Sequence, residues 1–182
     1  MAAPRQGSRA QSDGVIRWKF APFGELTPRE VHDLLQLRAE VFVVEQDCPF
    51  QDVDGVDPDS WHLLGTRGGS LIAYCRMIPA GVKFAEPSIG RVVTLPSLRG
   101  TGCGRSLMAE ALRRADTLWP GRAIRIGAQQ RLERFYEDFG FATASAPYDE
   151  DGIQHIEMLR PAPGALETTA RNAGQKQEGI QE

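Results

Sequence analysis

Residues 91–107 read Arg-Val-Val-Thr-Leu-Pro-Ser-Leu-Arg-Gly-Thr-Gly-Cys-Gly-Arg-Ser-Leu, and they decide how the rest of the chain is interpreted. The valine-rich run that ends at Thr94 is typical of a buried strand, and a helical pattern begins near Gly104. Between them, Gly100 and Gly102 permit backbone conformations and close approaches that a Cβ would prevent. A helix start offers unpaired N–H groups and a partial positive charge. The stretch therefore predicts a phosphate-binding turn between a strand and a helix.

Two common phosphate-binding motifs do not fit this turn. A P-loop would need one more residue than lies between Gly100 and Gly104, and Arg105 occupies the position of its lysine. A dinucleotide-binding fingerprint would need a third glycine where this chain has Arg105. The pattern Arg-Gly-Thr-Gly-Cys-Gly at residues 99–104 instead resembles the Arg/Gln-x-x-Gly-x-Gly pyrophosphate loop of the GNAT superfamily of acyl-CoA N-acyltransferases.

The composition is that of a globular chain with room for one core. We expect a single domain over residues 15–160, a disordered segment over residues 1–14 and a disordered polar tail over residues 161–182. The net charge of −3 comes without a basic patch, so no nucleic-acid partner is expected. No apolar run approaches the ~20 residues of a membrane span, and residues 1–14 lack the apolar core of a secretory signal. The expected location is cytoplasmic.

The order of expected elements predicts the fold class. Thr27 and Glu30 form a capping box that opens a helix at Pro28, and the apolar face of this helix continues as far as Phe42. Further helices are expected at residues 104–119 and 132–139. Strands are expected at residues 15–20, 61–66, 70–78, 89–94, 123–128, 141–144 and 153–159. This order predicts an α/β (α+β) fold, a mixed central sheet with helices on both faces, which is also the element order of the GNAT fold.

An acidic loop with Asp52, Asp54, Asp57 and Asp59 lies between the first helix and the second strand. Its spacing does not match a calcium loop, because the glycine comes one residue early and the glutamate at the twelfth position is missing. The three cysteines are widely spaced and form neither a disulfide framework nor a metal-binding pair. We therefore expect no metal site, and a loop that is solvated or forms a rim attracting a cationic substrate.

A second signature lies downstream of the glycine turn. Phe135 and Tyr136 precede Gly140 and Phe141, which resembles the GNAT segment in which a Phe-Tyr pair lies on a short helix before Gly-Phe. The resemblance implies that the Tyr136 hydroxyl lies near the sulfur of coenzyme A and protonates the leaving thiolate. The alternative is that Tyr136 is a core aromatic residue with its hydroxyl at the surface.

Three further segments narrow the resemblance to the ElaA subfamily of GNAT proteins. Residues 37–54 read Leu-Arg-x-x-Val-Phe-Val-Val-Glu-Gln-x-Cys-Pro-Phe-x-Asp-x-Asp, residues 61–64 read Trp-His-Leu-Leu, and residues 148–158 read Tyr-x-Glu-Asp-Gly-Ile-x-His-Ile-x-Met. The resemblance covers roughly residues 15–160. Phe50 stands where the subfamily is expected to have tyrosine, which removes one hydroxyl from a substrate wall.

The resemblance implies direct transfer of the acetyl group of acetyl-CoA to an amine of unknown identity. The implied cofactor-binding residues are Val92, Val93, Thr94, Arg99, Gly100, Thr101, Gly102, Cys103, Gly104 and Arg105. The strand edge at residues 92–94 would pair with the pantetheine arm, and an N–H of Val93 or Thr94 would stabilise the oxyanion. A thiol at a helix start tends to have a lowered pKa, but Cys103 is expected to fill a permissive position rather than act as a nucleophile.

The general base is left open by the sequence. Many GNAT enzymes have a glutamate on the central strand, but residues 89–94 contain no carboxylate. The candidates are Glu45, His62, His155 or a chain of water molecules, and Glu45 is the residue we place with Tyr136 in the predicted catalytic pair. A non-catalytic acyl-CoA-binding module or sensor remains the alternative function. The expected partners are a small-molecule or peptide amine and, since dimers are common in the superfamily, a second copy of the chain.

Overall fold

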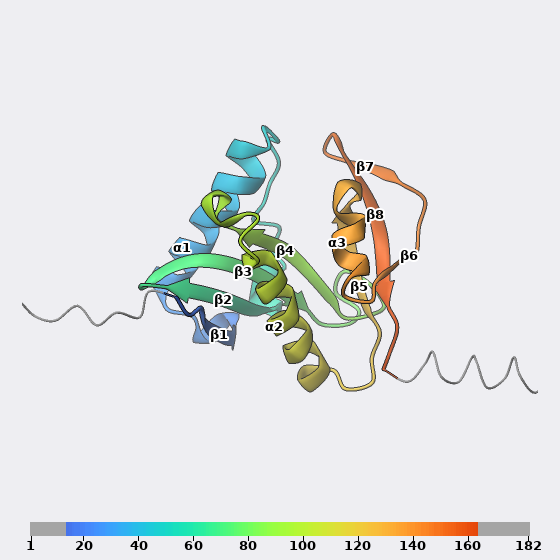
Figure 1. The fold of residues 1–182 in the computed structure, drawn as a ribbon, viewed down its shortest axis with the longest axis horizontal. Helices are drawn as coiled ribbons and strands as arrows, with labels where there is room; N and C mark the ends of the chain where they lie inside the picture. The colour runs from blue at the N-terminus through green and yellow to red at the C-terminus, as the bar shows by residue number, and fades with distance from the viewer. Residues whose placement is uncertain (1–13, 164–182) are drawn as a thin grey trace, which may run out of the picture.

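One mixed eight-stranded sheet with helices packed against it makes up residues 14–163, the part of the chain described by the computed structural model (Figure 1). The strands are β1 (Arg17–Pro22), β2 (Trp61–Arg67), β3 (Ser70–Ile78), β4 (Ser88–Thr94), β5 (Ile124–Gln129), β6 (Ala142–Thr143), β7 (Tyr148–Glu150) and β8 (Ile153–Arg160). The α-helices are α1 (Pro28–Arg38), α2 (Cys103–Leu118) and α3 (Glu133–Glu137). The two segments predicted to be disordered, residues 1–14 and 161–182, lie almost entirely outside the described residues. Among residues 14–163, no helix has the length and apolar character needed to cross a membrane.

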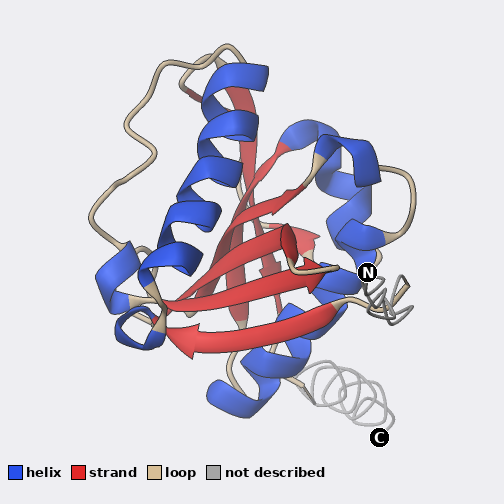
Figure 2. Ribbon diagram, turned by 90° about the vertical axis from the view of Figure 1, so that its left-hand side faces the viewer, coloured by secondary structure: helices blue, strands red, loops and turns tan. Residues whose placement is uncertain are grey.

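The sheet order is β1-β2-β3-β4-β5-β8-β6, with β7 paired to β8. Neighbouring residues of a strand face opposite sides, and the two sides are covered by different helices. Leu64 and Tyr74 pack with α1, whereas Leu63 and Cys75 belong to the cluster that contains the apolar face of α2. The predicted fold class, a mixed sheet with helices on both faces, is confirmed (Figure 2).

Two local structures predicted from short sequence patterns, a helix cap and a hairpin turn, are present in the structure. The Thr27 side chain accepts a hydrogen bond from Glu30 N, and the Glu30 side chain accepts one from Thr27 N, which completes the capping box at the start of α1. Gly68 and Gly69 have φ angles of 59° and 86° and join β2 to β3, because a tight hairpin turn needs two residues with positive φ.

Two elements differ from the expectation. The first helix does not continue in α form to Phe42, because residues Ala39–Glu45 form a π-helical segment, labelled η2, after α1. Such segments are frequent at functional sites. The short strand β7 was not predicted, although Asp151 and Gly152, with φ angles of 53° and 81°, form the turn of the β7–β8 hairpin. An Asp-Gly pair is a strong hairpin signal, so the sequence did contain this information.

The sheet opens between β4 and β5. The only parallel pairing among the described strands joins them at Ser88 opposite Arg125, and both strands then continue and diverge (Figure 1). A bulge on β4 adds to the opening, since Tyr74 pairs with Val93 while Arg76 pairs with Gly90. Two residues of β4, Arg91 and Val92, therefore lie opposite the single residue Cys75 of β3, and Arg91 has a φ of 52°. The divergence leaves one edge of β4 without a strand partner beside the glycine turn.

The expectation of a solvated or cation-attracting acidic loop is wrong. Three of its aspartates form a buried ion cluster with arginines of α1, β3 and β4. The buried ion cluster consists of Arg38, Arg76, Asp52 and Asp57, which are buried, and of Arg91 and Asp54 at its edge, whose side chains are 18% and 29% exposed. The Arg38 side chain is 0% exposed and Asp57 is only 6% exposed, so the charges must be paired within the protein. Within the described residues, no group of three or more His, Cys, Asp or Glu side chains is placed to hold a metal ion.

Candidate functional site

Two cavities occupy the opening between β4 and β5, and they meet at its centre. The glycine-loop cavity, of about 540 Å³, extends from residues 92–94 of β4 to the turn before α2. The second cavity, of about 130 Å³, follows β4 from Val92 back to Ser88 and reaches the β7–β8 hairpin. Six residues line both cavities and form what we call the junction: Phe42, Gln46, Val92, Gln129, Leu132 and Tyr136. Ligands in the two cavities would therefore contact the same group of side chains.

The turn before α2 offers backbone donors to the glycine-loop cavity. Gly102 caps the helix with a φ of 88°, and Ser106 N donates to Gly102 O at 3.0 Å. The N–H groups ahead of Ser106 belong to the first helical turn, which has no carbonyl partners of its own. Gly104 lines the cavity, and a Cβ added there would lie 3.9 Å from the Phe135 ring. These donors and the positive end of the helix dipole fit a pyrophosphate group.

The predicted cofactor residues are not all on the same side of the turn. Val92, Val93 and Thr94 line the glycine-loop cavity together with Arg99, Gly100, Gly102, Gly104 and Arg105. Thr101 and Cys103 instead line a separate shallow hollow beside Arg67. The Thr101 hydroxyl donates to Leu98 O at 2.7 Å, so it stabilises the turn itself. Burial raises the pKa of the Cys103 thiol, contrary to the lowering expected at a helix start.

Both arginines of the turn are paired with carboxylates. Arg99 Nη1 and Nη2 lie 2.6 and 2.8 Å from the two carboxylate oxygens of Glu45, at the end of the π-helical segment. Arg105 donates to the carboxylate of Asp138, and its guanidinium lies over the Phe139 ring. The side chains of Arg99 and Glu45 are 49% and 37% exposed. We call these two residues the loop pair.

Tyr136 is held at the junction by aromatic neighbours. It lies on α3, is 7% exposed, and its ring centroid lies 5.1 Å from that of Phe135 and 6.1 Å from that of Phe141 in edge-on arrangements. Burial raises the pKa of the hydroxyl, which is therefore protonated at neutral pH. Tyr136 therefore lines both cavities as a residue with a neutral hydroxyl.

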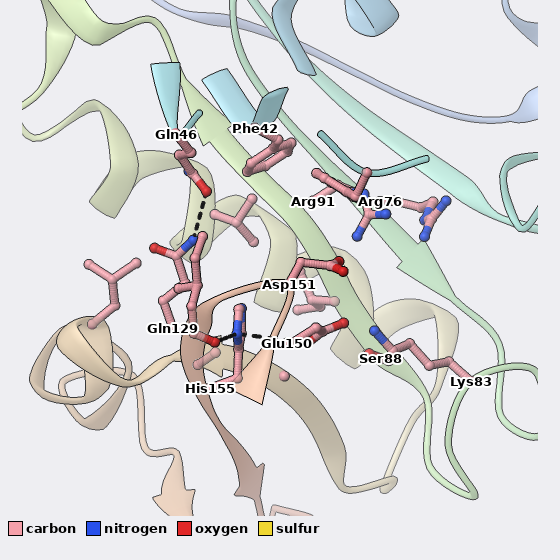
Figure 3. Close-up of a pocket in the computed structure, with 18 of the residues that line it drawn as sticks. Phe42, Gln46, Arg76, Lys83, Ser88, Arg91, Gln129, Glu150, Asp151 and His155 are labelled. Atoms are coloured by element: carbon pink, nitrogen blue, oxygen red, sulfur yellow. Dashed lines mark hydrogen bonds and ion pairs between the residues drawn. The ribbon is translucent and has the colours of Figure 1, made fainter. Parts of the chain in front are cut away.

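The second cavity is closed on one side by two contacts that bridge the opening of the sheet. Gln129 Nε2 donates to Gln46 Oε1 at 3.0 Å, and the Cys48 thiol donates to the carbonyl oxygen of Asp151 at 3.3 Å. Figure 3 shows Gln46 and Gln129 meeting above His155, with Arg76 and Arg91 on the other side of the cavity. The charged residues that line the cavity are Arg76, Lys83, Arg91, Glu150 and Asp151.

The three side chains considered as general bases have different surroundings. Glu45 lines neither cavity, and hydrogen bonds from Arg99 lower its pKa. His62 is 0% exposed, and its ring nitrogens lie 2.8 Å from the Tyr74 hydroxyl and 3.0 Å from Asp57 O. His155 lines the second cavity on β8, directly opposite Gln129 of β5. The structure thus brings His155 to the junction region with Tyr136, and places Glu45 and His62 elsewhere.

Several lining residues were not identified as site residues from the sequence. Gln46 and Gln129 are 83 positions apart, and the ElaA-like stretch that contains Gln46 does not indicate a role for it in the site. Glu150 and Asp151 reach the second cavity only because β7 pairs with β8. The Asp151-Gly152 turn could have indicated that hairpin, but not its position beside β4.

Comparisons with known proteins agree with the geometry. The family described as "Acetyltransferase (GNAT) domain" matches residues 36–160. Protein ElaA of Escherichia coli is 41% identical over 148 residues, which cover 80% of this chain and 97% of ElaA. A UPF0039 protein of Synechocystis is 41% identical over 149 residues, which cover 81% of this chain and 97% of that protein.

Solved structures show the same similarity. The crystal structure of an acyl-CoA N-acyltransferase from Pseudomonas aeruginosa superposes with a TM-score of 0.77 at 42% identity, over 80% of this chain and 99% of that chain. The crystal structure of Escherichia coli ElaA superposes with a TM-score of 0.76 at 40% identity, over 80% and 99% of the two chains.

Proposed function

The chain belongs to the GNAT acetyltransferase family, and on that premise we propose that it transfers the acetyl group of acetyl-CoA directly to an amine. Its general role is that of an acyl-CoA N-acyltransferase. The proposal adds three statements to this role: that the acyl group is acetyl, that the glycine-loop cavity holds the cofactor, and that Tyr136 is the general acid. Acetyl-CoA supplies the acetyl group as a thioester.

The glycine-loop cavity supplies the binding groups that an elongated anionic cofactor needs. The N–H groups at the start of α2 bind the pyrophosphate, and Arg99 and Arg105 add positive charge at the same place. The open edge of β4 at residues 92–94 pairs with the amide groups of the pantetheine arm as an added strand does. The arm then points its sulfur toward the junction, where Tyr136 lies.

Tyr136 gives its proton to the sulfur as the C–S bond breaks. Its hydroxyl is neutral because burial raises its pKa, so it carries the proton that the sulfur needs as negative charge develops on it. An N–H of Val93 or Thr94, on β4 beside the junction, stabilises the negative charge that develops on the carbonyl oxygen. The amine approaches from the second cavity, which meets the glycine-loop cavity at this point.

The position of Tyr136 at the junction carries the proposal, and the substitution Tyr136→Phe tests it. We expect kcat to fall about ten- to a hundredfold or more, while the Kd for acetyl-CoA changes less than about twofold. The assay measures release of free thiol from acetyl-CoA with a panel of amines, and calorimetry measures cofactor affinity.

Tyr74 offers a matched control for this substitution. It is as buried as Tyr136 and burial likewise raises its pKa, but it lines neither cavity and bonds to His62. We expect Tyr74→Phe to keep its turnover per folded molecule. Equal turnover in the wild type and Tyr136→Phe would remove this residue from the mechanism. Binding of acetyl-CoA without thiol release for every amine would favour the binding-module alternative.

A further inference from the structure

The second cavity contains a histidine whose two ring nitrogens have different surroundings. His155 lies on β8 opposite Gln129, and its side chain is 15% exposed within the cavity (Figure 3). Its ring stacks on Tyr148 of β7, with centroids 6.1 Å apart and an angle of 30° between the planes. The stacking and the strand pairing hold the imidazole in one orientation beside the junction.

The neighbours of Nδ1 determine which nitrogen carries the proton. Nδ1 lies 2.8 Å from the carbonyl oxygen of Ile153 and 3.9 Å from Oε2 of Glu150. A carbonyl and an ionised carboxylate only accept hydrogen bonds, so the hydrogen of the neutral ring must be on Nδ1. Nε2 then holds the lone pair. The ring is therefore in the tautomer that can take up a proton at Nε2.

The other side chains around the second cavity are less suited to accept a proton. Arg76, Arg91 and Lys83 are cations, and Glu150 and Asp151 lie on the exposed β7–β8 hairpin. Burial lowers the pKa of His62, but its ring nitrogens are already bonded. Glu45 belongs to the loop pair. His155 therefore combines a place in the cavity with an available lone pair.

We propose that His155 is the general base of the acetyl transfer, an inference that rests on the proposed function. An alkyl amine is only about one part in a thousand neutral near pH 7, so a primary ammonium must lose a proton before it attacks. His155 Nε2 takes that proton, while Nδ1 remains bonded to Ile153 O and lies 3.9 Å from Glu150 Oε2.

The remaining steps conserve atoms and charge. The neutral nitrogen attacks the thioester carbon and forms the C–N bond, the C–S bond breaks, and its electron pair stays on sulfur. Tyr136 donates its proton to the sulfur, and the surplus proton on nitrogen returns through water to the Tyr136 oxygen. His155 releases its proton to solvent through the mouth of the cavity. One ammonium and one acetyl thioester become one amide, one thiol and one proton.

The test is His155→Asn, assayed with two acceptors of similar shape and different basicity. The Asn side chain can still donate to Ile153 O, but it has no basic nitrogen. Ethylamine is almost fully protonated near neutral pH, whereas 2,2,2-trifluoroethylamine is mostly neutral there and needs no base for its first proton. We expect kcat/KM to fall about 100-fold with ethylamine and less than about threefold with trifluoroethylamine. His32→Asn, on the exposed side of α1, is the matched control and is expected to change neither value.

The outcomes separate this inference from the proposed function. An equal loss with both amines would mean that His155 only maintains the shape of the cavity, and no loss with either would exclude it from proton transfer. Both results overturn the assignment while leaving the transferase function intact. A wild-type protein that binds acetyl-CoA but transfers to neither amine nor to any other amine tested would overturn the proposed function, and His155 as its base with it.

Discussion

The buried ion cluster and the loop pair are built from the same groups at nearly the same distances. Arg38 lies 2.8 Å from carboxylate oxygens of Asp52 and Asp57, and Arg99 lies 2.6 Å from a carboxylate oxygen of Glu45. Their exposure differs, since the Arg38 side chain is 0% exposed and that of Arg99 is 49% exposed. Distance alone would assign both arrangements the same importance, but burial separates them.

This difference indicates two roles for the arginines beside the cavities. A buried arginine that loses its partner is left with an uncompensated charge, so the buried ion cluster fixes the loop that contains it. An exposed ion pair contributes little to the stability of the fold, and its arginine can exchange the carboxylate for another anion. The buried ion cluster therefore stabilises the wall of the second cavity, whereas the loop pair leaves Arg99 exposed, as the proposed binding of a phosphate group requires.

The largest predicted effect comes from breaking the buried ion cluster. Asp57 Oδ1 accepts from both Arg38 and Arg76, so Asp57→Asn takes a charged partner from two buried guanidinium groups. We expect the free energy of unfolding to fall by about 3–5 kcal/mol, measured by urea denaturation. Asp59→Asn, an exposed residue of the same short turn, is the control and is expected to stay within about 0.5 kcal/mol. A loss as small as the control's would mean that the cluster is solvated in solution.

Acid should weaken the buried ion cluster. Burial opposes ionisation of Asp57, but hydrogen bonds and charge from Arg38 and Arg76 outweigh it and hold its pKa below the usual range. The pKa of Asp54 is also well below its usual value, because burial is outweighed by Arg76. A lowered folded-state pKa adds stability that is complete about one pH unit above the unfolded pKa of about 3.9 and is lost as pH falls toward the folded value.

We therefore expect the free energy of unfolding to decline below about pH 5, and to decline less steeply in Asp57→Asn than in the wild type. Urea denaturation at a series of pH values measures both slopes. Parallel curves for the two proteins would show that Asp57 titrates alike in the folded and unfolded states. That result would contradict the assignment of its charge to the buried ion cluster.

The same contrast explains which features the sequence could predict. The glycine turn, the capping box of Thr27 and Glu30, and the Gly68-Gly69 hairpin depend on interactions within a few residues, so local spacing is sufficient. The pairing of Arg38 with Asp57 spans 19 positions and depends on how α1 packs on the sheet. A loop of aspartates appears solvated until the arginines from other elements are placed beside it.

The candidate site divides along the same line. Much of the lining of the glycine-loop cavity could be named from the sequence, because it comes from one continuous stretch. The second cavity could not, because Gln46, Gln129 and Asp151 come from segments that meet only across the opening of the sheet. The tautomer of His155 depends on the carbonyl of Ile153 and the carboxylate of Glu150, which is a property of the folded hairpin.

The smallest predicted effect concerns the loop pair. Under the proposed function Glu45 competes with the cofactor pyrophosphate for Arg99, so Glu45→Gln should lower the Kd for acetyl-CoA about two- to fivefold, equivalent to roughly 1 kcal/mol or less. Arg99→Gln should act in the opposite direction and weaken binding by about tenfold. The stability of Glu45→Gln should remain within about 0.5 kcal/mol of the wild type, because the pair is exposed.

Acetyl-pantetheine provides the control ligand for the loop pair, because it has the thioester and the pantetheine arm without the pyrophosphate. Calorimetric affinities for this ligand should be the same in the wild type, Glu45→Gln and Arg99→Gln. If both ligands respond equally to Glu45→Gln, the carboxylate acts through the position of the π-helical segment and not through Arg99. If neither responds, Arg99 does not contact the pyrophosphate, and the backbone N–H groups at the start of α2 hold it without help from this side chain.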